Sequence, residues 1–140
     1  MNLKPLRSLG LGLAFAVMAV GAAAADTRTV YPIYFDWGST TLDAKAMAEV
    51  KKAAPAAKAC EYNGVRVFGH ADTSHTEDES AQLGIARARA VREVLMKLGL
   101  ADSAIAFSTK GEHELAKETA NGVKEPLNRR VEIIVVCGRD

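Results

Sequence analysis

The chain has 140 residues, of which 49% are apolar and 25% are charged, and its formal net charge is +1. This length gives room for one domain, and the apolar and charged fractions argue against a disordered chain. The near-neutral charge argues against nucleic-acid binding, which normally shows a strong basic excess on one face.

Residues 1–25 differ in composition from the rest and have the marks of a secretory signal peptide: a basic start, an apolar run and closing alanines. We expect cleavage after Ala25, which leaves residues 26–140 as the mature domain. Without the two basic residues of the leader, this domain has 16 basic against 17 acidic residues. The alternative is an uncleaved anchor, because the uncharged stretch 8–25 could marginally cross a bilayer of about 30 Å.

The first half of the mature chain predicts a strand, a helix and a second strand. Residues 30–37 are rich in aromatic and β-branched side chains and predict the first strand. Asp43 should cap the helix that follows, in which Pro55 should cause a kink or a split. The apolar face of this helix consists of Ala46, Met47, Val50, Ala53 and Ala57. A turn at Asn63-Gly64 should then lead into the second strand, residues 65–69.

The second half predicts a long helix and two more strands. Residues 76–79 have the spacing of a capping box, and the helix that they start should run from about residue 77 to residue 98. A third, amphipathic strand is predicted at 105–110. The polar stretch 113–127 predicts a loop, with or without a short helical turn. Residues 130–137 form the longest β-branched run, which is typical of a strand in the middle of a sheet.

The order is therefore strand, helix, strand, helix, strand, strand. Right-handed crossovers should make the first three strands parallel, and the last strand should run antiparallel to them. The ends of the first two strands and the starts of the second helix and last strand then share one edge of the sheet. Cys60 and Cys137 fall at the opposite edge, and in an exported protein such a pair predicts a disulfide. No cysteine precedes Cys60, so the leader offers no thiol for lipid attachment.

Two charged residues near the second helix are candidate binding residues. Asp72 lies in the loop just past the second strand, and Arg87 follows Leu83 by four residues, so it faces inward with the apolar side chains. A guanidinium that faces inward needs a partner. We interpret Asp72 and Arg87 as the two poles of one binding site. The alternative is that Asp72 merely caps its loop and that Arg87 pairs with Glu79 or Glu93 on the surface.

Four separated motifs carry a family resemblance. They are Phe35-Asp36, Gly69-His70-Ala71-Asp72, Leu83-Gly84 with Arg87-Ala88, and Asn128-Arg129-Arg130-Val131-Glu132-Ile133. With these motifs and fifteen residues from Asp72 to Arg87, the stretch 31–136 resembles the OmpA-like peptidoglycan-binding domain. That family includes the peptidoglycan-associated lipoprotein and the flagellar stator anchor. The resemblance implies an α/β (α+β) two-layer sandwich, in which both helices cover one face of a mixed four-stranded sheet.

The resemblance also implies a function: non-catalytic recognition of the peptidoglycan stem peptide, chiefly its diaminopimelate residue, without a cofactor or a metal. The binding residues would be Phe35, Asp36, Asp72, Arg87, Asn128 and Arg129. An acid and a bidentate base held apart complement the ammonium and the carboxylates of diaminopimelate. Arg129 and Arg130 alternate across a strand, so at most one faces the pocket, and the family pattern assigns Arg129. We expect a periplasmic protein associated with the cell wall or the outer membrane, and outer-membrane or envelope proteins are left open as further partners.

Three positions depart from the family pattern. Gly38 and Ser80 remove amide or carboxylate groups that are usual there, and His75 puts an imidazole at the pocket rim in place of a glycine. These changes bear on the affinity and on which stem peptide is preferred. They also support a second hypothesis, a periplasmic protein-interaction module with weakened wall binding.

A third hypothesis is a metal-dependent periplasmic hydrolase. His70, Asp72 and His75 have the residue types of a metal site, and only His113 is available as a further histidine ligand. Trp37 and Phe68 are expected in the core or in the wall of the pocket.

Overall fold

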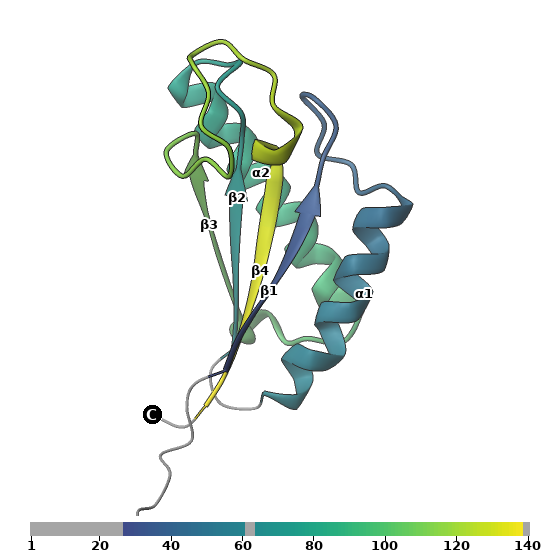
Figure 1. Ribbon diagram of the computed structural model, residues 1–140. Helices are drawn as coiled ribbons and strands as arrows, with labels where there is room; N and C mark the ends of the chain where they lie inside the picture. Colours follow the sequence, from purple (N-terminus) through teal and green to yellow (C-terminus); the bar gives the residue numbers. More distant parts are fainter. Residues whose placement is uncertain (1–26, 61–63, 139–140) are drawn as a thin grey trace, which may run out of the picture.

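The computed structural model describes residues 27–60 and 64–138, so the predicted leader and Asn63 lie outside the described residues. The elements are β1 (Thr27–Tyr34), α1 (Ala44–Ala59), β2 (Val65–His70), α2 (Glu77–Lys97), β3 (Ile105–Gly111) and β4 (Arg130–Cys137), with two short turns, η1 (Asp102–Ala104) and η2 (Pro126–Asn128). This is the predicted order of helices and strands (Figure 1). Within the described ranges, neither helix is long and apolar enough to cross a bilayer.

The four strands form one mixed sheet in the order β1-β4-β2-β3. β4 runs antiparallel to both β1 and β2, and β2 runs parallel to β3, which confirms the predicted strand directions. Val131, Ile133 and Val135 of β4 belong to the core, while Ile134 is buried on the other face of the sheet. The β-branched run therefore forms an inner strand, as its composition indicates.

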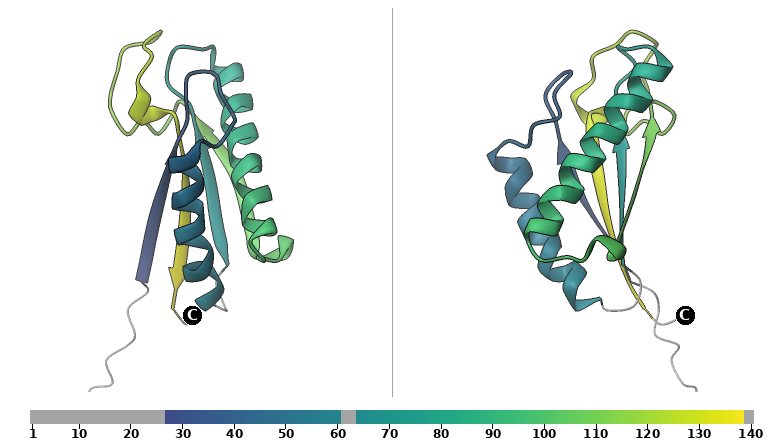
Figure 2. Two further views of the ribbon diagram at one scale, coloured as in Figure 1. Left: turned by 90° about the vertical axis from the view of Figure 1, so that its right-hand side faces the viewer. Right: turned by 180° about the vertical axis from the view of Figure 1, so that it is seen from behind.

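Both helices cover the same face of the sheet, so the domain has two layers (Figure 2). The core between the layers contains Val50 and Ala53 of α1, Val91 and Leu95 of α2, and Ile33, Val67 and Ile133 of the sheet. The two-layer α+β architecture expected from the motifs is confirmed.

Pro55 does not split α1, which was one of the two effects predicted for it. The helix runs unbroken from Ala44 to Ala59 with Pro55 inside it. Pro55 cannot donate to the carbonyl of Lys51, but both residues lie on the exposed side of the helix. Water can therefore supply the missing hydrogen bond, which makes the proline tolerable there.

A close approach between β2 and α2 fixes the position of the second helix. A Cβ atom added to Gly69 would lie 1.7 Å from the carbonyl oxygen of Gly84, so only glycine allows these backbones to touch. Thr76 and Glu79 form the predicted capping box at the start of α2. These contacts set how deeply Arg87, one turn after Gly84, enters the protein.

Cys60 and Cys137 form the predicted disulfide, with 5.0 Å between their Cα atoms. Cys137 also lies opposite Thr27 in the register of β1 and β4. The disulfide is at the end of the sheet where β1 begins, and the long loops are at the other end (Figure 1).

Candidate functional site

Three loops meet at one end of the sheet (Figure 1). They are residues 35–43 between β1 and α1, residues 71–76 between β2 and α2, and residues 112–129 between β3 and β4. The amide of Gly122 donates to the carbonyl of Thr73 at 2.6 Å, and the amide of Phe35 donates to the carbonyl of Arg129 at 2.9 Å. The predicted shared edge is therefore present, and its loops are hydrogen-bonded to one another.

Arg87 is wholly buried beneath these loops, with 0% of its surface exposed. Its Nε donates to the carbonyl of Ser39 at 2.9 Å, and its two terminal nitrogens donate to the carbonyls of His70 and Asp36 at 3.0 and 3.1 Å. The ring of Phe35 lies 5.3 Å from the guanidinium carbon. Arg87 thus joins the 35–43 loop to the end of β2 through neutral acceptors.

The charge of Arg87 has no carboxylate partner within ion-pair distance among the described residues. Burial lowers its pKa to about 10, the nearby Asp72 acts to raise that pKa, and Arg129 acts to lower it. The guanidinium therefore remains protonated at neutral pH. It has five N–H donors and uses three of them for the carbonyls, so it retains donors for an anion.

Asp72 is buried as well, with 1% of its surface exposed. Its Oδ1 accepts from the amide and the hydroxyl of Ser74 at 3.2 and 2.5 Å. Its Oδ2 accepts from the amide of Glu125 and from Arg129, both at 3.2 Å. Burial acts to raise the pKa of Asp72, but the hydrogen bonds from Ser74 and Arg129 outweigh burial, so the pKa is lowered. The carboxylate is therefore ionised at neutral pH.

The two predicted poles thus lie in one buried region, but they do not pair with each other. The alternative that Arg87 pairs with Glu79 or Glu93 on the surface is wrong. Its side chain is buried, and its hydrogen bonds go to three backbone carbonyls. The loops cover both side chains, so neither charge is open to solvent in this structure.

Arg129 and Arg130 diverge as predicted. Arg129 donates to the carbonyl of Phe35 at 3.1 Å and pairs with Asp72. Arg130 pairs with Glu132 at 2.8 Å. Arg129 is therefore the member of the pair that contacts Asp72.

The other predicted site residues are Asn128, Phe35 and Asp36, and each makes a different kind of contact. Asn128 is wholly buried, and its amide accepts from the Lys117 amide at 2.9 Å and donates to the Lys117 carbonyl at 2.8 Å, which fixes the 112–129 loop. Phe35 is buried against Arg87. Asp36 offers its carbonyl to Arg87, while its own side chain is exposed.

Two depressions flank the 35–43 loop. One, of about 340 Å³, lies above α2 and is lined by Gly38, His75, Glu79, Gln82 and Leu83. The other, of about 220 Å³, is lined by Tyr34, Phe35, Asp36, Thr41, Asp43, Pro126, Leu127 and Arg129. Arg87 itself is not in the lining of either depression. The second depression is lined by Phe35, Asp36 and Arg129, and of these Phe35 and Asp36 contact Arg87.

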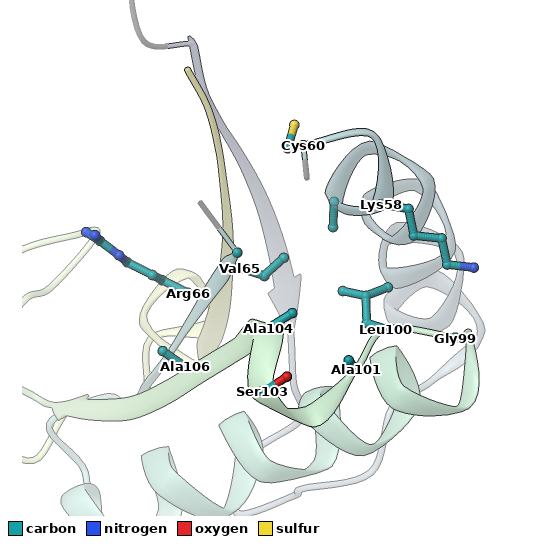
Figure 3. A pocket seen from close by; sticks show the side chains of 12 residues that line it. Lys58, Cys60, Val65, Arg66, Gly99, Leu100, Ala101, Ser103, Ala104 and Ala106 are labelled. Carbon is teal, nitrogen blue, oxygen red and sulfur yellow. The ribbon is translucent and has the colours of Figure 1, made fainter. Parts of the chain in front are cut away.

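A larger cavity, of about 580 Å³, lies at the other end of the sheet, beside Cys60. Its two basic side chains, Lys58 and Arg66, point away from each other (Figure 3). Much of the remaining lining is alanine and glycine. Because no charged groups converge there, this cavity does not have the chemistry of an ion-binding site.

The residues of the metal hypothesis do not come together. Within residues 27–60 and 64–138 there is no group of three or more His, Cys, Asp or Glu side chains that could hold a metal ion. His70 approaches Glu132 at 3.8 Å, His75 stacks on Trp37, and His113 contacts Glu77 at 2.9 Å. The histidines therefore have separate surroundings.

Trp37 and Phe68 are not in the core, which was the first of the two places predicted for them. Trp37 is 49% exposed and lies at the outer surface of the loops. Phe68 is half-buried beneath the ammonium of Lys110, which is 5.2 Å from the ring centre. The sequence reasoning also missed Ser74 and Lys124, which contact Asp72 and Trp37. A serine two residues after an aspartate is a turn signal that could have identified Ser74.

The sequence model of the OmpA family matches residues 34–129. An outer membrane protein of Gluconacetobacter diazotrophicus is 33% identical over 111 residues, which are 75% of this chain. The matched residues are 29% of that relative, so the chain spans less than a third of its length.

Solved structures share the fold. The OmpA-like domain of FopA1 from Francisella tularensis matches with a TM-score of 0.68 and 24% identity, over 84% of this chain and 77% of that chain. The peptidoglycan-associated lipoprotein of Burkholderia pseudomallei also has a TM-score of 0.68 and 24% identity, with 76% and 89% covered. The periplasmic domain of Helicobacter pylori MotB has a TM-score of 0.65 and 18% identity, with 82% and 84% covered.

Proposed function

This chain belongs to the OmpA family, and on that premise we propose that it binds the peptidoglycan stem peptide without catalysis. The ligand group is diaminopimelate, and binding tethers the envelope to the cell wall in the periplasm. The observation that carries the proposal is Arg87, a wholly buried guanidinium whose hydrogen bonds go only to neutral carbonyls.

A buried cation without an anion is costly, and buried charges are normally paired. Asp72 is the nearest candidate partner, but it pairs with Arg129. Two guanidinium groups, those of Arg87 and Arg129, are thus buried or nearly buried near a single carboxylate, that of Asp72. A ligand carboxylate at Arg87 would balance this excess of positive charge.

Diaminopimelate carries both negatively charged carboxylates and a positively charged ammonium group. We assign its carboxylate to Arg87 and its ammonium to Asp72. Phe35 and the backbone of Asp36 line the site, while Asn128 and Arg129 hold the 112–129 loop and the Asp72 carboxylate in place. The name of one structural neighbour, a peptidoglycan-associated lipoprotein, supports the same class of ligand.

Titration calorimetry with two tripeptides tests this assignment. One contains diaminopimelate and the other contains lysine, which lacks the second carboxylate. The loss of one charge-assisted hydrogen-bonding group predicts that the lysine peptide binds about ten to a hundred times more weakly. Equal affinities would show that Arg87 does not bind the carboxylate.

Co-sedimentation with purified peptidoglycan tests the site residues. Asp72→Asn and Arg87→Lys should each reduce the bound fraction at least about tenfold. The matched control is Asp78→Asn, because Asp78 is exposed at the start of α2. Circular dichroism confirms that each variant is folded. If both site variants sediment as wild type does, the assignment is wrong.

A second candidate is a protein-interaction module of the envelope with weakened wall binding. It is favoured by the exposure of Tyr34 and Leu127, 46% and 47%, beside the smaller depression. Folded wild-type protein that neither sediments with peptidoglycan nor binds the diaminopimelate peptide would support this candidate.

A further inference from the structure

Trp37 lies in the 35–43 loop and contacts residues of the other two loops of the site, 71–76 and 112–129. Its ring stacks on His75, with 5.4 Å between ring centres and 12° between the planes. The ammonium of Lys124 lies 3.6 Å from the centre of the Trp37 ring. The indole N–H donates to the hydroxyl of Ser74 at 2.9 Å. Trp37, Ser74, His75 and Lys124, here called the Trp37 latch, thus connect all three loops of the site.

Ser74 couples this latch to the buried carboxylate. Its hydroxyl accepts from the Trp37 indole and donates to Oδ1 of Asp72 at 2.5 Å. A rotation of the hydroxyl away from Asp72 also moves the acceptor on which Trp37 depends. The state of the carboxylate and the position of the indole are therefore linked through one side chain.

The Asp72 carboxylate has no free capacity for a ligand. It accepts four hydrogen bonds, two from Ser74, one from the Glu125 amide and one from Arg129, and a carboxylate has about four acceptor sites. An incoming ammonium must displace one of these donors. Two are backbone amides fixed by the loops, and Arg129 carries a charge. The Ser74 hydroxyl is the only neutral, rotatable donor, so it yields first.

We propose that the Trp37 latch is the gate of the site and that a ligand ammonium opens it. The ammonium replaces the Ser74 hydroxyl at Asp72, Ser74 turns away, and Trp37 loses its acceptor and leaves His75 and Lys124. The latch then no longer covers Asp72, of which only 1% of the surface is exposed while Ser74 and Trp37 are in place. The inference rests on the proposed function, since it requires a cationic group at Asp72. It makes Trp37 and Ser74 determinants of which ligands enter.

Trp37 is the only tryptophan in the chain, so its fluorescence reports on the latch directly. The diaminopimelate tripeptide should change the emission saturably, with the same dissociation constant as calorimetry gives. Acrylamide quenching should increase in the bound state, because the indole loses its contacts with His75 and Lys124.

Two variants open the latch without ligand. Ser74→Ala removes the acceptor of the indole, and Lys124→Met removes the cation above the ring. In each, the free protein should already show stronger quenching, and the association rate of the tripeptide should rise about threefold to tenfold, since less of the protein is closed. Matched controls are Ser103→Ala and Lys45→Met, at exposed positions away from the latch.

The outcomes separate the two proposals. Tripeptide binding by calorimetry without a change in emission or quenching, together with wild-type behaviour of Ser74→Ala, would overturn the gate and leave the proposed function standing. If no tripeptide binds to the wild type, the proposed function fails, and the gate fails with it.

Discussion

Asp72 forms its ion pair with Arg129, 57 residues further along the chain, and not with Arg87, which is only fifteen residues away in the sequence. Arg129 is near because β4, which starts at the next residue, pairs with both β1 and β2. The result is a buried group of two cations and one anion. The proposed binding of a ligand carboxylate rests on this excess of positive charge.

Replacement of Arg129 by methionine should lower the free energy of unfolding by about 2 to 4 kcal/mol, because Asp72 would stay buried without its cation. Urea unfolding followed by circular dichroism measures this change. Arg89→Met is the control, since Arg89 is exposed and should change stability by less than about 0.5 kcal/mol. Equal stabilities of the two variants would contradict the role given to the ion pair.

His70 should make the protein less stable in mild acid. Burial, followed by the positive charge of Arg130, lowers its pKa to about 4, while Glu132 and Glu114 act more weakly in the other direction. In the unfolded chain a histidine titrates near about 6.5, so the unfolded state binds the proton first as the pH falls. Stability is therefore full above pH 6.5 and declines toward pH 4, by up to about 3 kcal/mol.

The comparison of wild type with His70→Met isolates this effect, because both proteins share every other titrating group. The unfolding free energy of wild type minus that of His70→Met should decrease as the pH falls from about 7 to about 4. Parallel curves for wild type and His70→Met would show that His70 titrates normally.

Reduction of the Cys60–Cys137 disulfide should cost about 4 kcal/mol in the chain-entropy model, because the bridge spans 77 residues. Urea midpoints with and without a reductant measure the cost. A Cys60→Ala/Cys137→Ala double variant should match the reduced wild type and should not respond to the reductant. A midpoint that is unchanged by reduction would mean that the bridge adds no stability.

Gly84→Ala should destabilise the protein by about 3 kcal/mol, as expected for a clash in a packed interior. Its Cβ would lie 2.2 Å from the Thr109 hydroxyl and 3.0 Å from the Gly69 carbonyl, so α2 must move off β2. Thr109→Ala in the same protein should recover only part of the loss, because the Gly69 carbonyl remains. Tripeptide affinity should also fall, since Arg87 moves with the helix. Full recovery in the double variant would mean that the backbone contact is not limiting.

The order and directions of the elements could be predicted because each depends on a local period or a connection rule. The long β-branched run placed β4 inside the sheet, and the capping box placed the start of α2. The first strand was predicted at 30–37 because of its aromatic residues, but β1 ends at Tyr34, whose partner Arg130 is the first residue of β4. Pairing, rather than composition, sets that end.

The partners within the site could not be predicted from the sequence. They depend on the path of the 112–129 loop, which no hydrophobic period determines. That loop supplies Glu125 and Arg129 to Asp72 and Lys124 to Trp37. The inward direction of Arg87 did follow from helical spacing, but its carbonyl acceptors belong to other segments.

The antiparallel register of β1 on β4, from Thr27 opposite Cys137 to Tyr34 opposite Arg130, has a mechanical consequence. A tensile load applied between the loop end and Thr27 acts along the strand axes, and the hydrogen bonds of this pair are perpendicular to those axes. The load is thus shared by all of them in shear, instead of breaking them one after another. A fold connected in this way resists extension along its strands, which suits the wall-binding role proposed above.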